Sequence, residues 1–225
     1  MKYKALLLDI DNTLYSYDYA HLEAKSRVFL FFKTKFNLQV DVLDEAYSKA
    51  RASVHIDLIG SGASHNRILY FQKMLEFLEL DIFTYTLEIY EIYWSTFLEY
   101  MKKFTGVDEV LTKYQNKICL VTDLTAHIQH RKANKLELNK YVKKMVTSEE
   151  SGHEKPHSYI FILALQKLGL NENEVCMIGD NFKKDIIGAS NLGINSIWLN
   201  LNNEKQKYNN LVKEVNKFED ILGLI

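Results

Sequence analysis

The sequence is poor in the residues that interrupt helices or cross-link a chain. It contains one proline, nine glycines and two cysteines among 225 residues. Because proline and glycine are so scarce, long helices meet few breakers. Cys119 and Cys176 each lie within an apolar run that predicts a buried strand. We therefore expect two separate core thiols and no disulfide framework.

Long apolar runs and a strong net charge are also lacking. No segment approaches the roughly 18 apolar residues that cross a bilayer, and residues 1–8 do not have the pattern of a secretory signal. A net charge of -1 provides no field that would hold nucleic acid or anionic lipid. With 12% aromatic residues the chain is not disordered. The composition predicts a soluble cytoplasmic protein without nucleic-acid or membrane partners.

What the sequence does contain is a series of short apolar runs that end abruptly at polar residues. Such runs, without strict alternation, are typical of strands buried in a parallel sheet. Helical patterns separate most of them, which predicts an α/β fold with a doubly wound, Rossmann-like parallel sheet. The predicted strands are residues 5–8, 118–121, 145–146, 175–178 and 196–199.

Residues 16–102 interrupt this rhythm, because they contain helical patterns and no convincing strand. The interval is much longer than the dozen residues that a crossover helix needs. We therefore predict an all-helical domain at 16–102, inserted into a core formed by 1–15 and 103–225. The clearest helical patterns are 23–36, 42–52, 66–80 and 86–101. Ten aromatic residues are expected in the core of this helical domain: Phe29, Phe31, Phe32, Tyr70, Phe71, Phe77, Tyr90, Tyr93, Trp94 and Phe97.

Polar residues follow the predicted strands at the points where the strands end. In an open parallel sheet, ligands bind outside the carboxyl ends of the strands. Four carboxylates, one hydroxyl and one ammonium are expected to meet there: Asp9, Asp11, Asp180, Asp185, Thr122 and Lys155.

Four acids beside one lysine leave a formal charge near -3, and clustered carboxylates raise one another's pKa. A divalent cation would offset two of these charges and a proton on one acid would offset the third. Ligation by oxygen alone suits Mg²⁺ better than zinc. The alternative is that acids such as Asp11 and Asp180 only cap helices. That alternative explains a single acid more easily than the whole set.

The order of these motifs resembles that of the haloacid dehalogenase-like hydrolase superfamily, which is mostly phosphatases. The matching residues are DIDNT at Asp9 to Thr13, Thr122 in LVTD, Lys155 in EKP, and GDNFKKD at 179–185. All four superfamily motifs are present in order, and the helical insertion matches the superfamily's helical cap. The chain looks most like the branch that holds N-acylneuraminate-9-phosphate phosphatase and nucleotidases.

The resemblance implies a reaction on a phosphate ester. Asp9 would attack phosphorus and form an aspartyl-phosphate, and Asp11 would protonate the leaving oxygen and later deprotonate water. Thr122 would hydrogen-bond the phosphate, and Lys155 would pair with it.

The resemblance also implies a bound Mg²⁺ ion. It would be held by the Asp9 carboxylate, the Asp11 backbone carbonyl and Asp180, with Asp185 orienting a metal-bound water or Lys155. The superfamily's dehalogenases lack an acid at the position of Asp11, so this residue favours phosphate over halide chemistry.

Three residues are weaker candidates for substrate binding. Asp123 stands where many relatives have Asn or Ser, and we expect it to point away from the phosphate or to cap the next helix. His65 and Arg67 lie in the polar stretch 60–67 of the helical domain, where Arg67 could pair with an anionic substrate. The alternative there is an ordinary interhelix turn with Ser64 as the N-cap.

The substrate predicted from these features is a small phosphorylated metabolite, either a sugar phosphate or a nucleoside monophosphate. The cap is expected to close over it and exclude water. A phosphomutase, a 2-haloacid dehalogenase and a catalytically inactive binding protein stay open as alternatives. Either a monomer or a homodimer fits the sequence.

Overall fold

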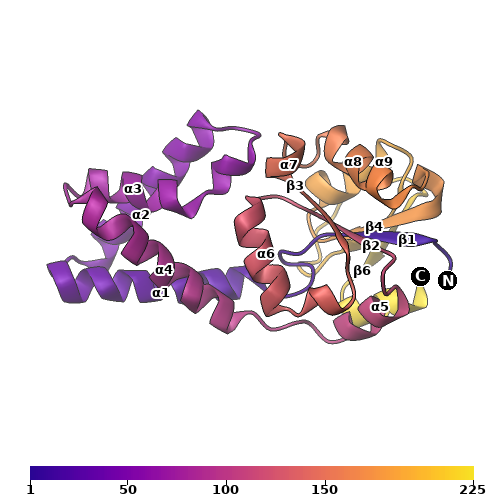
Figure 1. The fold of residues 1–225 in the computed structure, drawn as a ribbon, viewed down its shortest axis with the longest axis horizontal. Coiled ribbons are helices and arrows are strands. Elements are labelled where there is room, and N and C mark those ends of the chain that lie inside the picture. The colour runs from indigo at the N-terminus through magenta and orange to yellow at the C-terminus, as the bar shows by residue number, and fades with distance from the viewer. The chain divides into compact units, whose positions relative to one another are not determined.

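The computed structural model describes all residues from Met1 to Ile225. Contacts divide the chain into two compact units, one of Met1–Ser16 with Lys102–Ile225 and one of Tyr17–Met101. The first unit is α/β and the second is all-helical (Figure 1). None of the helices combines the length and the apolar character that a bilayer span requires.

The first unit is built on a six-stranded parallel sheet in the order β3-β2-β1-β4-β5-β6. The predicted α/β fold with a parallel sheet is confirmed. β1 lies between β2 and β4, so residues that follow these three strands emerge side by side. The strands are β1 Ala5–Leu8, β2 Ile118–Thr122, β3 Lys144–Thr147, β4 Val175–Gly179, β5 Asn195–Leu199 and β6 Val212–Val215.

Every residue of β1, β2 and β4 is buried, which explains why these strands read as continuous apolar runs. Figure 1 shows α8 and α9 on one side of the sheet and α5 on the other. Cys119 and Cys176 are buried free thiols, as predicted. The helices are α5 Val107–Lys113, α6 Ala126–Lys135, α7 Ser148–Ser151, α8 Ser158–Leu168 and α9 Gly188–Ser190, with a π-helical turn at Phe182–Ile187.

The second unit contains four helices that bury an aromatic interior. Eight of the ten aromatic residues predicted for this interior are buried. Phe31 is only partly buried, and Phe77 is 40% exposed because it lies at the last residue of its helix. The helices are α1 Tyr17–Phe36, α2 Val40–Asp57, α3 Arg67–Phe77 and α4 Ile82–Tyr100, with a short 3₁₀ turn at Gly62–His65.

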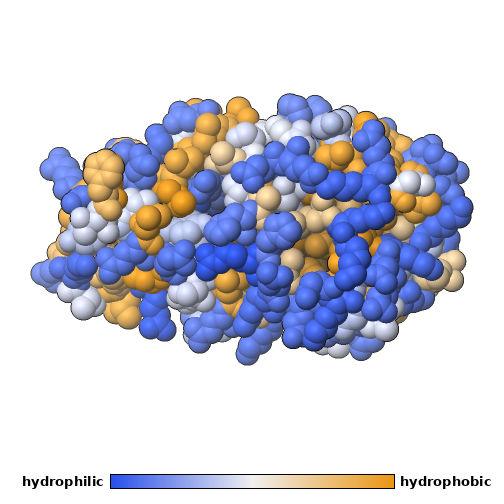
Figure 2. All heavy atoms as spheres, in the orientation of Figure 1, coloured by the Kyte–Doolittle hydropathy of each residue, from blue (hydrophilic) through white to orange (hydrophobic).

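The surface is mainly polar. Figure 2 shows charged and polar residues over most of the visible face, with apolar residues scattered among them. Isolated apolar side chains of this kind are normal on folded proteins.

Candidate active site

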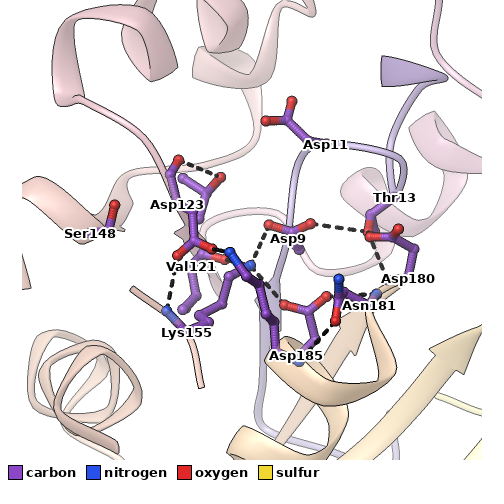
Figure 3. A network of polar contacts seen from close by, with 12 residues as sticks. Asp9, Asp11, Thr13, Val121, Asp123, Ser148, Lys155, Asp180, Asn181 and Asp185 are labelled. Carbon is purple, nitrogen blue, oxygen red and sulfur yellow. Dashed lines mark hydrogen bonds and ion pairs between the residues drawn. The ribbon is translucent and has the colours of Figure 1, made fainter. Parts of the chain in front are cut away.

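Three carboxylates meet at the carboxyl ends of β1 and β4. Asp9 follows β1 directly, Asp180 follows β4, and Asp185 lies one turn further along the chain. One carboxylate oxygen from each lies within 4.8 Å of the others. Asp9 is 5% exposed and Asp185 is fully buried, so these charges have little access to bulk water. The sequence prediction that these three acids converge therefore agrees with their geometry (Figure 3).

Lys155 is the cation that holds this carboxylate cluster together. Its Nζ lies 2.6 Å from Asp9 Oδ1 and 2.7 Å from Asp185 Oδ1. It also donates a hydrogen bond of 3.0 Å to the carbonyl oxygen of Val121 in β2. Two hydrogen bonds and an ion pair with Asp185 therefore hold the ammonium, although the side chain is only 3% exposed. Lys155 thus ties the ends of β1 and β2 to the turn after β4.

Thr13 links two of the acids from the opposite side. Its Oγ1 lies 3.3 Å from both Asp9 Oδ2 and Asp180 Oδ1, and it accepts a hydrogen bond of 3.1 Å from the Asp180 backbone N–H. The residue is completely buried. Sequence reasoning placed Thr13 in the first motif but gave it no role. These contacts show that the first motif, through Thr13, also holds Asp180 in position.

The carboxylates are short of positive charge. Three acids beside Lys155 carry a formal charge of about -2 when all are ionised. Burial, with repulsion from Asp185 and Asp11, raises the pKa of Asp9 to about 7, although Lys155 opposes this. Burial and the charges of Asp185 and Asp9 raise the pKa of Asp180 to about 8. Burial also raises the pKa of Asp185.

Lys155 responds in the complementary direction. Burial alone would lower its pKa, but the neighbouring carboxylates of Asp185, Asp9 and Asp123 raise it well above its usual value. The ammonium is therefore charged at any pH at which the protein is folded, and it supplies one positive charge to the cluster. A further cation is needed for all three acids to ionise together.

These residues fit Mg²⁺. The ligands are carboxylate oxygens alone, the charge deficit is two, and the carboxylates are close enough to share one ion. Gly179 makes room for one of them, because a Cβ at this position would lie 2.4 Å from Asp185 Oδ2. The Asn181 backbone N–H donates to the same oxygen at 3.0 Å, and the other oxygen of this carboxylate pairs with Lys155. Asp185, expected to act behind the metal ligands, is thus close enough to Asp9 and Asp180 to share an ion with them, and its role at the metal stays a prediction.

Asp11 occupies a different position from the other acids. Figure 3 shows its carboxylate directed away from Asp9. Both of its oxygens lie close to Lys132 Nζ, at 2.6 and 2.8 Å, and the Tyr15 hydroxyl donates to Oδ1. The Lys132 side chain is completely buried, whereas that of Asp11 is 24% exposed. The side chain of Asp11 therefore lies outside the carboxylate cluster, and a contact through its backbone carbonyl stays a prediction.

Sequence reasoning missed Lys132. It lies in α6 among several other basic and polar residues, and nothing in that helix distinguishes it from a solvated lysine. Only the folded chain brings it to Asp11. Neither Asp11 nor Asp180 caps a helix, since Asn181 provides the N-cap of the turn after β4 by accepting from Lys184 N.

Thr122 and Asp123 end β2 beside the cluster. Thr122 is 1% exposed, and its Oγ1 accepts a hydrogen bond of 2.8 Å from Gln129 Nε2. Asp123 accepts from the Lys155 backbone N–H at 3.0 Å and pairs with Lys184 at 2.7 Å. Of the two expectations for Asp123, capping of the next helix was wrong, because Thr125 holds the N-cap position of α6 and the Asp123 carboxylate accepts from Lys155 N instead. That it points away from a bound phosphate stays a prediction.

The two candidates from the helical unit do not form an exposed loop. Arg67 is the first residue of α3, is 5% exposed, and donates to the Tyr17 hydroxyl and to the His65 carbonyl. The N-cap of α3 is Asn66, not Ser64. The His65 ring lies 4.7 Å from that of His55.

Comparisons with known proteins give relatives that are named as phosphatases or as a nucleotidase. A ribulose-1,5-bisphosphate 5-phosphatase of Halopiger xanaduensis is 34% identical over 203 residues, which span 86% of this chain and 83% of that protein. A glyceraldehyde 3-phosphate phosphatase of Methanopyrus kandleri is 29% identical, over 85% and 81% of the two chains. The pyrimidine 5'-nucleotidase YjjG of Escherichia coli is 25% identical, over 92% and 90%.

Solved structures share the fold. A 2-haloacid dehalogenase from Pseudomonas syringae matches with a TM-score of 0.75 at 20% identity, over 99% of this chain and 97% of that one. The magnesium-bound HAD-hydrolase YfnB of Bacillus subtilis matches with a TM-score of 0.71 at 18% identity, over 100% and 99%. A family model described as haloacid dehalogenase-like hydrolase matches residues 3–193. The chain belongs to the haloacid dehalogenase-like hydrolases.

Proposed function

We propose that this hydrolase cleaves phosphate monoesters of small metabolites with Asp9 as its nucleophile and Mg²⁺ as its cofactor. The observation that carries the proposal is the position of Asp9, a buried carboxylate held by Lys155 among two further acids. Three relatives are named for action on a sugar bisphosphate, a triose phosphate and a nucleotide. A sugar phosphate or a nucleoside monophosphate is therefore the proposed substrate class.

Asp9 begins the reaction. One of its carboxylate oxygens attacks phosphorus, the bond from phosphorus to the ester oxygen breaks, and an aspartyl-phosphate forms. Lys155 and the Thr13 hydroxyl contact the two oxygens of the Asp9 carboxylate. These contacts restrict the rotation of the side chain and keep it in the orientation that attacks phosphorus. When bound by Asp9, Asp180 and Asp185, Mg²⁺ supplies the positive charge that lets two anions approach and stabilises charge on the phosphoryl oxygens.

Asp11 serves as the acid and base in this proposal. As a carboxylic acid it gives its proton to the leaving ester oxygen, so that an alcohol departs. It then takes a proton from the water that attacks the phosphorus of the aspartyl-phosphate, which releases phosphate and restores Asp9. For this its side chain turns toward Asp9 from the ion pair with Lys132. Lys132 thus acts as a positioning residue, because its ion pair sets the position of the Asp11 side chain before the reaction.

Thr122 and the backbone after β2 receive the phosphoryl oxygens. The Thr122 hydroxyl oxygen accepts from Gln129 Nε2, and its hydrogen donates to the Asp123 carbonyl oxygen 3.4 Å away, a long contact that it would exchange for a phosphoryl oxygen. Asp123 is already engaged by Lys184 and by the Lys155 backbone, so its charge is balanced before any phosphate binds. Its presence where relatives have Asn or Ser is thereby compatible with phosphate binding.

Asp11 also separates the proposed activity from its rivals. A dehalogenase needs neither a leaving-group acid nor a metal site, whereas this chain has both Asp11 and the carboxylate cluster. A phosphomutase would use the same pair of acids but would return the phosphoryl group to a sugar hydroxyl. Product analysis separates these two reactions, because only hydrolysis releases inorganic phosphate at the rate of substrate loss.

The test is the release of phosphate from an aryl phosphate and from a panel of sugar phosphates and nucleoside monophosphates, with Mg²⁺ or with a chelator. We expect turnover that requires Mg²⁺ and is lost in Asp9→Asn by a factor of about 10³ or more. Asp220→Asn, which makes the same change at an exposed acid of the same unit, is the control. Full activity in Asp9→Asn would disprove the assignment of the nucleophile.

A further inference from the structure

The helical unit contains a basic pocket of its own between α1 and α2. The pocket, here called the α1–α2 pocket, has a volume of about 360 Å³. His21 and Lys25 line it from successive turns of α1, and Arg51 and His55 do so from successive turns of α2. Tyr47, Ser48 and Ala52 complete the lining, so no carboxylate faces the pocket.

Positive charge around this pocket exceeds negative charge. Lys25 pairs with Asp44, but Arg51 forms no ion pair. Arg67 lies next to the pocket lining, and its guanidinium faces the rings of Tyr70 and Tyr93 at 4.8 and 5.4 Å. Three cations are thus balanced by a single exposed acid.

Arg67 itself has no carboxylate partner. It is 5% exposed, and its guanidinium donates to the Tyr17 hydroxyl and to the His65 carbonyl, both neutral. Its Nε is buried without any hydrogen-bond acceptor. A buried charge that lacks a counter-ion costs a folded protein several kcal/mol. Such a cation is typical of a site where an anion supplies the missing charge.

The tyrosines connect Arg67 to the pocket. The Tyr70 hydroxyl donates to the Ser64 carbonyl at 2.7 Å, so its oxygen can only accept from His55 Nε2, 2.6 Å away. The Tyr93 hydroxyl lies 2.7 Å from His21 Nδ1. Both histidines that line the pocket are therefore fixed by the tyrosines whose rings hold the guanidinium.

The positive charges around the pocket affect the pKa of His21. Burial, followed by the charges of Arg67, Lys25 and Arg51, lowers the pKa of this histidine to about 3. A neutral imidazole donates one N–H and accepts at its other nitrogen. His21 therefore adds hydrogen-bonding capacity to the pocket without adding charge.

We propose that the α1–α2 pocket is an anion site that binds a phosphate-type oxyanion. Lys25 and Arg51 would contact the anion directly, Ser48 would donate through its hydroxyl, and the charge of Arg67 would act from behind the tyrosines. The volume exceeds that of one inorganic phosphate and accommodates the phosphate of a small organic molecule. The site lies within the helical unit and does not depend on the proposed reaction at Asp9.

Two sources can provide such an anion. One is a second anionic group on the substrate itself, and the other is a separate phosphorylated metabolite that binds to the cap. Both use the same recognition chemistry, so the site is tested first with inorganic phosphate alone. The full-length protein is titrated with phosphate by calorimetry, in chelator and at constant ionic strength, so that the carboxylate cluster holds no metal and repels the anion.

The test variant is Lys25→Gln/Arg51→Gln. The Arg51 side chain is exposed, and the Lys25 side chain is 25% exposed with its ammonium over the rings of Phe29 and Tyr47, so the fold of the variant is checked by circular dichroism. The control is Arg27→Gln/Lys49→Gln, which removes the same charge from the same two helices outside the pocket lining. Each lost contact to an ionised group weakens binding by about tenfold or more. We expect at least tenfold weaker phosphate binding in the test variant and unchanged binding in the control. Equal binding in all three proteins, or none in the wild type, overturns the proposal.

A second measurement assigns the source of the anion. Where the substrate supplies it, kcat/KM for a sugar bisphosphate falls in the test variant by at least tenfold, while kcat/KM for an aryl monophosphate is unchanged. Where a separate metabolite supplies it, neither value falls, but phosphate binding is still lost. Because calorimetry without metal involves no turnover, failure of the proposed hydrolysis would leave the result on this site intact.

Discussion

The carboxylate cluster should make the metal-free protein less stable as pH rises. The pKa of Asp180 is about 8 in the folded protein and 3.8 in its ordinary state, so the folded chain binds this proton more tightly than the unfolded chain. Stability therefore falls between about pH 4 and pH 8, because the unfolded chain ionises in this range while the folded chain still holds the proton. This is the reverse of the usual behaviour of a salt-bridged aspartate.

The size of the effect follows from the difference between the two pKa values. A difference of about 4, at 1.36 kcal/mol for each pKa unit, sets an upper limit of about 6 kcal/mol. Asp180 is partly exposed, and its repulsion by Asp9 and Asp185 decreases when either of them is protonated. We therefore expect the free energy of unfolding to fall by about 2–4 kcal/mol between pH 5 and pH 8.

The perturbation is Asp180→Asn, which keeps the shape of the side chain and removes its charge. In chelator at pH 8 this variant should unfold at higher urea concentration than the wild type, whereas at pH 5 the two should be similar. Added Mg²⁺ should stabilise the wild type at pH 8 and the variant much less, because one ligand is lost. The assay is urea denaturation followed by circular dichroism, with Asp220→Asn as the control.

Two outcomes would refute this reasoning. If the metal-free wild type became more stable from pH 5 to pH 8, the carboxylates would already be balanced without a cation. If Asp180→Asn followed the wild-type pH dependence, the loss of stability would arise elsewhere in the chain. Either result would remove the charge deficit as an argument for Mg²⁺.

Two further predictions concern residues around the same site. Gly179→Ala places a methyl group against the Asp185 carboxylate, so Mg²⁺-dependent turnover should fall by more than about tenfold. The control is Gly223→Ala, where no atom lies within 4 Å of the added Cβ and turnover should not change. Unchanged turnover in Gly179→Ala would contradict the close approach of Asp185 to this glycine. Asp11→Ala removes the carboxylate that pairs with the buried ammonium of Lys132 and should lower the free energy of unfolding by about 3 kcal/mol. The double variant Asp11→Ala/Lys132→Met should recover most of this loss in urea denaturation, which a purely catalytic role for Asp11 does not predict.

The sheet could be predicted from sequence because its central strands are buried on both faces. Such strands are apolar at every position, and β1, β2, β4 and β5 were found within one residue of their observed ends. β6 was missed, because an edge strand is only half buried. Its sequence is Val-Lys-Glu-Val, and only the two valines are buried. Neither its length nor its composition distinguishes it from a polar loop.

The helices of the helical unit were predicted in outline but not at all of their ends. α1 begins at Tyr17, six residues before the predicted start, and its first turn contains the polar residue Asp18 and the partly polar side chains of two tyrosines. Arg67 belonged both to the polar stretch 60–67 and to the helical pattern 66–80. In the structure the polar stretch ends at Asn66, whose side chain accepts from Ile68 N, and α3 begins at Arg67. The helical pattern therefore describes Arg67 better than the polar stretch, but its burial could not be predicted.

The candidate site was predictable where the chain itself enforces proximity, and not elsewhere. Parallel strands that end at the same edge bring Asp9 and Asp180 together whatever the helices do. The partners of Asp11 and Arg67 depend on how helices pack, and no spacing in the sequence encodes that. Yet both cases follow one physical rule, since each buried charge requires an opposite charge. Asp11 finds it in Lys132, the carboxylate cluster is two positive charges short, and Arg67 has no carboxylate at all. The charges of Asp11 and Lys132 balance each other within the protein. The carboxylate cluster lacks positive charge that a bound cation would supply, and Arg67 in the helical unit lacks negative charge that a bound anion would supply.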